Sequence, residues 1–291
     1  MNTYNKPQNV DIAYFSGTGG TKLAALSLSD SLKDRSINVN AIELNSKTSA
    51  DNGKADMIII LFPVYAANAP QPIYDYIEKL PKAENIPAAV ISVPGGGDVF
   101  PNKGCRIHTI KRLTDKGYVT VYEDMLVMPA NFLTPTPDEL SVFLIKALPL
   151  KTKRIAGDIA SGVLKPAKPG IADKAVSSLL ELQKKGGKQF GNKIITGSSC
   201  NGCGLCANSC PSGNIEMKNG KPEYKSSCLM CMKCLYNCPQ KALKPGVAKF
   251  MVLKSGFNIN KLKILSDETP NDSINSDRIK VLTHNLAFSG L

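Results

Sequence analysis

Eight of the nine cysteines lie in one stretch of the chain, where the same spacing occurs twice. Each half reads C-x2-C-x2-C-x3-C-P, so the second half is an internal duplication of the first. The eight positions are Cys200, Cys203, Cys206, Cys210, Cys228, Cys231, Cys234 and Cys238. In a reducing compartment, thiolates gathered this densely are metal ligands more often than disulfides.

The spacing of the cysteines distinguishes an iron–sulfur site from a zinc site. Three cysteines placed three residues apart can wrap one face of an iron–sulfur cubane, whereas the fourth is carried away along the chain. Zinc, the alternative, prefers tetrahedral sets built from two separated C-x2-C pairs. The sequence therefore predicts two iron–sulfur clusters that exchange their fourth ligands. Cluster 1 takes Cys200, Cys203, Cys206 and Cys238, and cluster 2 takes Cys228, Cys231, Cys234 and Cys210.

A second chemical feature is the glycine-rich loop "FSGTGGTK" at 15–22, between a predicted strand and a predicted helix. It is not a Walker A loop, and Lys22 stands where a dinucleotide-binding loop has its third glycine. Hydroxyls and bare backbone amides at the start of a helix suit a terminal phosphate monoester. The alternative is a glycine-rich turn without a ligand. The donors are Ser16, Gly17, Thr18, Gly19, Gly20 and Thr21.

Alternating strand and helix patterns position this loop. Strands are predicted at 10–16, 37–44, 57–64, 88–94 and 118–127, and helices at 21–35, 72–80 and 105–117. Strands separated by helices favour a parallel sheet covered on both faces. We therefore expect a doubly wound α/β domain.

The rest of the chain is less regular. A helix is predicted over 137–164, with a break or kink at Pro149. Another is predicted over 172–185, and the glycine-rich 186–193 is typical of a domain boundary. The polar 267–278 is expected to be a loop. The expected domains are 1–165, a helical and basic linker at 166–195, a cysteine domain at 196–246, and an extension at 247–291.

Both motifs resemble known families. The loop S-x-T-G-x-T is similar to that of the flavodoxins, across about residues 10–130, and the cysteine segment resembles the bacterial two-cluster ferredoxins, across about 198–245. The order "YFSGTGGT", "PVYAANAP", "PGGG" and "MPANF" ahead of the cysteines resembles the flavodoxin–ferredoxin fusion proteins of anaerobic bacteria and archaea. The resemblance implies a flavodoxin-like sheet followed by a small ferredoxin-like α+β domain, bound FMN, and two [4Fe-4S] clusters that carry low-potential electrons.

The flavodoxin resemblance adds two loops that leave strand ends, where ligands of open α/β sheets bind. Tyr65 is expected to stack on the flavin ring, and three glycines to let the backbone approach its polar edge. The chain has no Trp, and Phe100 is the nearest aromatic residue to those glycines. The implied residues are Pro63, Val64, Tyr65, Ala66, Gly95, Gly96, Gly97 and Asp98.

Charge and composition limit the partners. The formal net charge is +12, but the lysine-rich stretches lack the interleaved aromatics of a single-strand-binding surface. We expect acidic redox-protein partners and no nucleic acid. The start of the chain has no signal-peptide pattern, and no apolar run is long enough to cross a bilayer, so we expect a cytoplasmic protein.

The reading that unites these features is an electron-transfer flavo-iron–sulfur protein. Two alternatives stay open: a flavin-dependent reductase fed through the clusters, and a ferredoxin whose flavodoxin-like part is an empty docking domain. Cys105 and His108, three apart on one predicted helix, are more typical of a buried apolar group and a surface group than of a catalytic pair.

Overall fold

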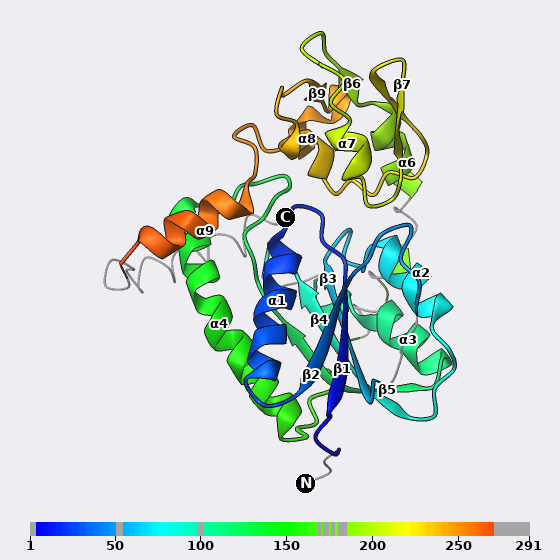
Figure 1. The fold of residues 1–291 in the computed structure, drawn as a ribbon, viewed down its shortest axis with the longest axis vertical. Helices are drawn as coiled ribbons and strands as arrows, with labels where there is room; N and C mark the ends of the chain where they lie inside the picture. Colours follow the sequence, from blue (N-terminus) through cyan, green and yellow to red (C-terminus); the bar gives the residue numbers. More distant parts are fainter. Residues whose placement is uncertain are drawn as a thin grey trace.

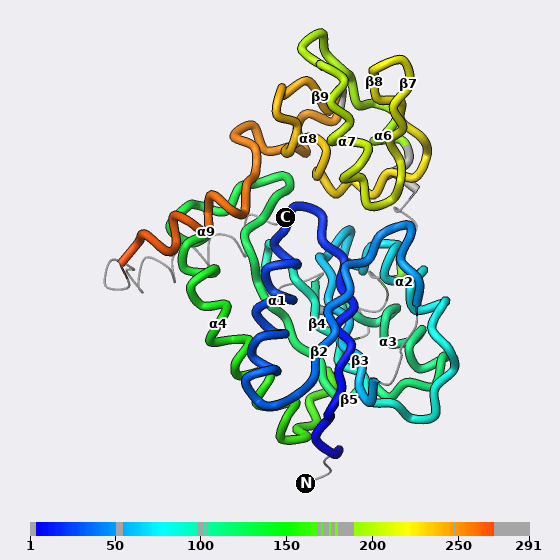
Figure 2. The backbone as a smooth tube through the Cα atoms, in the orientation of Figure 1, coloured from blue at the N-terminus to red at the C-terminus, as the bar shows by residue number. Residues whose placement is uncertain are grey.

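The computed structural model describes residues 4–50, 55–97, 102–167 and 185–270, together with isolated positions between 170 and 179. It shows a larger α/β domain with a smaller cysteine-rich module beyond one end of its sheet (Figure 1). A helix near the end of the described chain then returns to the α/β domain (Figure 2).

The sheet has five strands, all parallel, in the order β2-β1-β3-β4-β5. This order is that of the flavodoxin-like doubly wound sheet. The predicted fold class is therefore confirmed. The strands are β1 (Asn9–Tyr14), β2 (Asn38–Glu43), β3 (Met57–Pro63), β4 (Ile86–Val93) and β5 (Tyr118–Met125).

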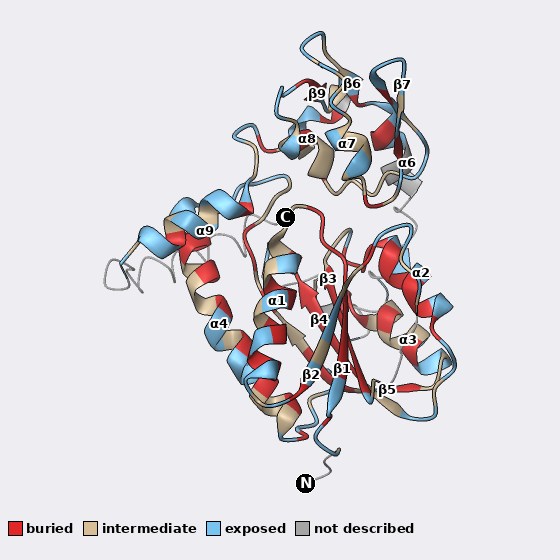
Figure 3. Ribbon diagram, in the orientation of Figure 1, coloured by how far each residue is buried: buried red, intermediate tan, exposed pale blue. Residues whose placement is uncertain are grey.

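The central strands are buried on both faces, as Figure 3 shows. The sequence of β3, MIIILFP, is continuously apolar because helices cover both of its sides. One face packs against α1 (Gly20–Lys33) and α4 (Asp138–Ala160). The other face packs against α2 (Gln71–Lys79) and α3 (Ile107–Asp115).

The predicted break in α4 does not occur, because the helix runs through Pro149 as one element. Proline removes one helical hydrogen bond, but apolar side chains on both sides of it, including Leu148 and Ile155, are buried against the sheet. Thr152 contributes as well, since its hydroxyl lies 2.8 Å from that of Ser27 in α1. Tertiary packing thus outweighs the free-energy cost of a proline inside the helix.

No helix in the described part of the chain is long and apolar enough to cross a membrane.

The cysteine-rich module, residues 185–251, is held by two small antiparallel pairings, β6 with β9 and β7 with β8. Phe190 in α6 is buried in the module's core beside Met232 and Leu243. The glycine-rich segment predicted as a boundary therefore belongs to this module, while most of the helix predicted over 172–185 lies outside the described residues. The elements are α6 (Lys185–Asn192), β6 (Ile195–Thr196), α7 (Leu205–Asn208), β7 (Ile215–Lys218), β8 (Lys221–Tyr224), α8 (Lys233–Asn237), β9 (Leu243–Lys244) and η3 (Gly246–Met251).

The segment after the module forms α9 (Ile259–Glu268), which packs along α4 (Figure 2). Asn258 caps the helix by accepting hydrogen bonds from two backbone N–H groups. Ile259 and Phe257 join the core of the α/β domain. The loop predicted over 267–278 begins inside α9, and its positions from 271 onward lie outside the described residues.

Asp124, at the end of β5, ties the sheet to its flanking segments. Its carboxylate accepts hydrogen bonds from Arg154 at 2.7 Å, Lys165 at 2.8 Å and the Tyr122 hydroxyl at 3.1 Å. Burial alone would raise the pKa of this carboxyl, but Lys165, the Met125 amide and Arg154 outweigh burial, so the pKa is lowered. A lowered folded-state pKa stabilises the fold above the unfolded pKa, and that contribution is lost as the pH falls below about 4.

We expect Asp124→Asn to destabilise the protein at pH 7 by about 1–2 kcal/mol, because both cations lose their charged partner. The thermal midpoint, followed by circular dichroism, should fall by several degrees. Asp115→Asn is the control, since the Asp115–Lys111 pair is exposed and should contribute little. Equal losses in the two variants would contradict a special role for Asp124.

Candidate cofactor sites

Two hollows in the cysteine-rich module each gather four cysteines. The first is lined by Cys200, Cys203, Cys206 and Cys238, with Met217 and Leu243 beside them. Gly204, with a φ of 74°, turns the chain into α7 between two of these cysteines. The Cys203 residue is exposed, and the other three are half-buried.

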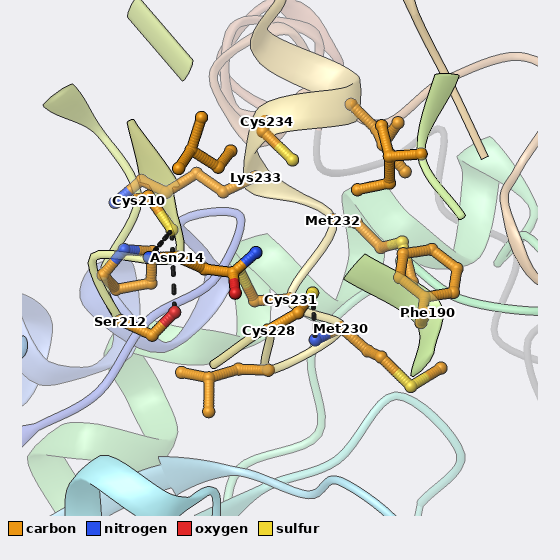
Figure 4. A pocket seen from close by; sticks show the side chains of 15 residues that line it. Phe190, Cys210, Ser212, Asn214, Cys228, Met230, Cys231, Met232, Lys233 and Cys234 are labelled. Carbon is orange, nitrogen blue, oxygen red and sulfur yellow. Dashed lines mark hydrogen bonds between the residues drawn. The ribbon is translucent and has the colours of Figure 1, made fainter. Parts of the chain in front are cut away.

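The second hollow is lined by Cys210, Cys228, Cys231 and Cys234, which surround it in Figure 4. Two of the sulfurs accept backbone hydrogen bonds: Asn214 N–H donates to Cys210 at 3.3 Å, and Met230 N–H donates to Cys228 at 3.5 Å. Such bonds stabilise thiolates. The cysteines that sequence spacing assigns to different halves of the motif therefore share one hollow.

Burial makes the second hollow costly for bare thiolates. It raises the pKa of Cys231 to about 12 and that of Cys234 further, and neighbouring cysteines add to both shifts. Positive charge from iron would reverse this effect. In the described part of the chain, no three Cys, His, Asp or Glu side chains converge closely enough to hold a single metal ion. Each sulfur set does supply the four thiolate ligands that a [4Fe-4S] cluster takes.

The predicted phosphate loop connects β1 to α1, with Gly19 at a φ of 101° before the first helical residue. Ser16 Oγ accepts a hydrogen bond from Lys22 N–H at 3.2 Å. Among the described residues, no acceptor is seen for the backbone N–H groups from Gly17 to Thr21. Five adjacent donors without an acceptor, at the positive end of a helix, fit a bound phosphate.

The cysteine-rich module packs directly on this loop. A Cβ at Gly17 would lie 2.5 Å from the Tyr65 hydroxyl and 2.9 Å from the Cys231 carbonyl oxygen. A Cβ at Gly19 would lie 2.6 Å from Ile259 of α9. Only glycine permits either approach.

The loop after β3 makes a tight turn in which Tyr65 and Asn68 exchange backbone hydrogen bonds of 2.9 and 3.0 Å. Ala66 and Ala67, with φ of 46° and 52°, both adopt left-handed conformations that cost free energy in residues other than glycine. Pro63 and Val64 precede the turn and are half-buried.

Tyr65 itself lies between the phosphate loop and the second hollow. Its ring meets Phe15 edge-on at 6.2 Å, and it packs near Leu229 and Cys231. Burial, followed by the nearby Cys231 and Cys228, raises the pKa of its phenol well above 10. Flavin stacking by Tyr65 stays a prediction, and in this structure its hydroxyl lies against Gly17.

The loop after β4 lies near Ala130. A Cβ at Gly95 would come within 2.7 Å of Ala130, whereas Gly96 is exposed and Gly97 has open space around it. Asn102 donates a hydrogen bond to the Gly97 carbonyl at 3.0 Å. Asp98 and Phe100 lie outside the described residues.

Below this loop is a buried ion pair that sequence reasoning missed. Arg106 Nε lies 2.9 Å from Glu123, and Arg106 also donates to Ser92 Oγ at 2.8 Å. The adjacent Cys105 is fully buried, and burial raises the pKa of its thiol, as expected for a small core residue rather than a nucleophile. No sequence pattern marks this pair, since Arg106 immediately precedes α3 whereas Glu123 lies in β5.

Sequence reasoning also missed the contacts that join the two parts. Asn131 Nδ2 donates to Thr18 Oγ1 at 2.7 Å, and the Asn131 carbonyl accepts from the Tyr236 hydroxyl of α8 at 2.9 Å. Tyr236 in turn accepts from Leu253 N–H at 2.9 Å. A chain of hydrogen bonds thus links the phosphate loop to α8, the helix that contains Cys234 and ends just before Cys238. The "MPANF" segment that contains Asn131 was the available signal.

Comparisons with known proteins match the two parts of the chain separately. The family model of the 4Fe-4S dicluster domain matches residues 199–243. No curated protein sequence matches the chain. The fold of the first part is fixed by its strand order, and residues 199–243 form a 4Fe-4S dicluster domain. The expected combination of a flavodoxin-like domain with a two-cluster domain is confirmed.

Several solved structures align with about half of the chain. A flavodoxin from the domain Archaea has 13% identity and a TM-score of 0.36, over 52% of this chain and 98% of that one. The flavodoxin of Streptococcus pneumonia TIGR4 has 19% identity and a TM-score of 0.39, over 52% and 99%. Flavodoxin 1 from Bacillus cereus has 14% identity and a TM-score of 0.38, over 52% and 96%.

Gly17→Ala should disturb the second hollow, because the new methyl group would collide with Tyr65 and the Cys231 backbone. We expect less iron per chain after anaerobic reconstitution and a lower thermal midpoint. Gly20→Ala is the matched control in the same loop, since its Cβ would meet only Met128, at 3.8 Å. Identical iron contents in the two variants would show that the module does not rest on Gly17.

Proposed function

We propose that the protein transfers electrons between FMN, bound at the 15–22 loop, and two [4Fe-4S] clusters in the cysteine-rich module. The observation that carries the proposal is the contact between the phosphate loop and the second cysteine set, where the Cys231 backbone packs on Gly17. A flavin exchanges one or two electrons and each cluster exchanges one, so their pairing converts between two-electron and one-electron chemistry.

The chain's own groups account for FMN as the flavin. The N–H groups from Gly17 to Thr21 offer donors for a phosphate, and the α1 N-terminus favours negative charge. Thr18 is held by Asn131, which orients the loop. Riboflavin has no phosphate and would leave these donors without an acceptor.

We propose the cluster ligands that the sequence spacing predicts, and the two hollows support them. Cys238 would complete the set of Cys200, Cys203 and Cys206, and Cys210 would complete the set of Cys228, Cys231 and Cys234. The residues lining each hollow support this exchange of fourth ligands. It suits a duplicated motif in which each triplet covers three corners of a cubane.

The domain limits and the cellular compartment are proposed on less direct observations. We propose domain limits at 165, 195 and 246, with α6 of the linker packed onto the dicluster domain and therefore counted above in the cysteine-rich module. The limit at 165 is supported by the backbone bridge between Lys165 and Tyr122 of β5, which keeps the chain on the α/β domain up to that residue. The limits of the dicluster domain are supported by the pairing of β6 with β9, which joins its two ends. We place the protein in the cytoplasm because thiolate-ligated clusters suit a reducing compartment.

FMN should bind far more tightly than riboflavin, and reduction of the bound FMN should be followed by bleaching of cluster absorbance. Thr21→Val should weaken FMN binding about 10–100-fold, as expected for a lost hydrogen bond to a charged group. Anaerobic titration and rapid-mixing absorbance measure the two effects.

Riboflavin is the internal control for that experiment. Thr21→Val should leave riboflavin affinity unchanged, because the substitution removes only a phosphate partner. Equal affinity of the wild type for the two flavins would refute the phosphate site. Tight FMN binding without cluster bleaching would refute electron transfer between them.

The wild type should hold about eight irons per chain, as two cubanes require. Cys238→Ala should damage the cluster of Cys203, with a spectrum that matches Cys203→Ala and differs from Cys234→Ala. Iron analysis and electron paramagnetic resonance (EPR) of the reduced variants measure this. A Cys238→Ala spectrum that matches Cys234→Ala would overturn the exchange of ligands.

A further inference from the structure

We propose that the two clusters have separate positions on the electron path. The inner cluster, at the second hollow, faces the flavin site, and the outer cluster, at the first hollow, is where an acidic redox protein docks. This inference rests on the proposed function for its two clusters and its flavin.

The inner cluster is attached to the α/β domain through the neighbours of three of its ligands. Ser46 N–H, in the loop after β2, donates to the carbonyl of Pro211, next to Cys210, at 2.8 Å. The Cys231 carbonyl packs on Gly17. Lys233, next to Cys234, lies 4.0 Å from Glu43 at the end of β2. All three contacts lie at the carboxyl edge of the sheet, where ligands of such folds bind.

The outer cluster has different surroundings. Both hollows are lined by residues of the cysteine-rich module, but among the described residues no hydrogen bond or ion pair joins the lining of the first hollow to the α/β domain. Cys203 is exposed, as are its neighbours Asn201 and Leu205, the latter at 43%. An electron at this cluster is therefore separated from a docked partner by little protein.

The two clusters are connected by the short helices α7 and α8, which pack against each other. Each helix contains a ligand of one cluster and is followed by a ligand of the other: Cys206 lies in α7 and Cys210 follows it, and Cys234 lies in α8 and Cys238 follows it. The exchange of fourth ligands places the two clusters side by side. Electrons can then pass from the sheet edge to the exposed face in two steps.

Charge identifies the partner. Between 196 and 245 the chain has six lysines and two glutamates. Lys233 lies at the junction with the α/β domain, but Lys221 and Lys241 are exposed near the outer cluster, and Lys221 donates to the Cys200 carbonyl at 2.9 Å. This positive face favours a partner with an acidic surface and steers its approach.

The first test measures access from solvent. Chromium(III) oxalate, a paramagnetic anion that stays in solution, should speed the EPR relaxation of one cluster of the reduced wild type and leave the other nearly unchanged. The signal lost in Cys203→Ala should be the accessible one, and the signal lost in Cys234→Ala the protected one. Equal access, or the reverse assignment, would overturn the inference.

The second test measures electron delivery to an acidic flavodoxin used as a probe acceptor. Lys221→Glu should slow the transfer at least about five-fold at low salt, and the difference should vanish at high salt. Lys82→Glu makes the same charge change beyond the end of α2, at the opposite edge of the sheet, and should have no effect. Equal slowing in the two variants would refute docking at the outer cluster.

The two tests separate this inference from the proposed function. The relaxation experiment with chromium oxalate requires only the two clusters, and it measures the solvent access of each cluster whether or not FMN is bound. One accessible and one protected cluster, in the assignment above, support the placement even where flavin-to-cluster transfer is absent, a result that would refute the proposed function alone.

Discussion

The contact between Gly17 and the Cys231 backbone is the constraint on which the arrangement of the whole molecule depends. A side chain at position 17 would enter space that the Tyr65 hydroxyl and the Cys231 carbonyl already fill. The same glycine leaves its N–H bare for a phosphate. One residue without a side chain therefore serves two requirements, donors for an anion and close approach of a second module, and the two sites are adjacent because of it.

Such a close approach needs support elsewhere, because a backbone contact on glycine buries little apolar surface. The support comes from the segment after the clusters. Leu253 N–H and the Asn131 carbonyl both bond to Tyr236, and Phe257 then packs near the Tyr236 ring. Ile259 continues into the core of the α/β domain beside Gly19. The extension thus provides further contacts between the cysteine-rich module and the α/β domain next to the phosphate loop.

The parts of this arrangement that follow local rules could be predicted from the sequence. The order of strands and helices follows from apolar periodicity. Spacing also predicts that Cys238 serves the first triplet, whose hollow it lines, although its role as a ligand stays a prediction. The continuity of α4 through Pro149 could not be predicted, because burial against α1 decides it. The packing of α9 on α4 could not be predicted either, because the short amphipathic pattern of α9 does not indicate which element it packs against. Contacts such as Asn131 with Tyr236 join residues far apart in sequence and leave no periodic signal.

The duplicated motif gives the two clusters equivalent ligands, but their surroundings make them unequal. An added electron increases the negative charge of a cluster, and burial at the second hollow disfavours that charge. The N–H groups of Asn214 and Met230, which point at sulfurs of this set, act in the opposite direction, and Lys233 adds positive charge beside it. At the first hollow, Ala242 N–H donates to Cys238 at 3.3 Å, and solvent reaches Cys203. Protein donors at the inner site thus replace the solvation available at the outer one.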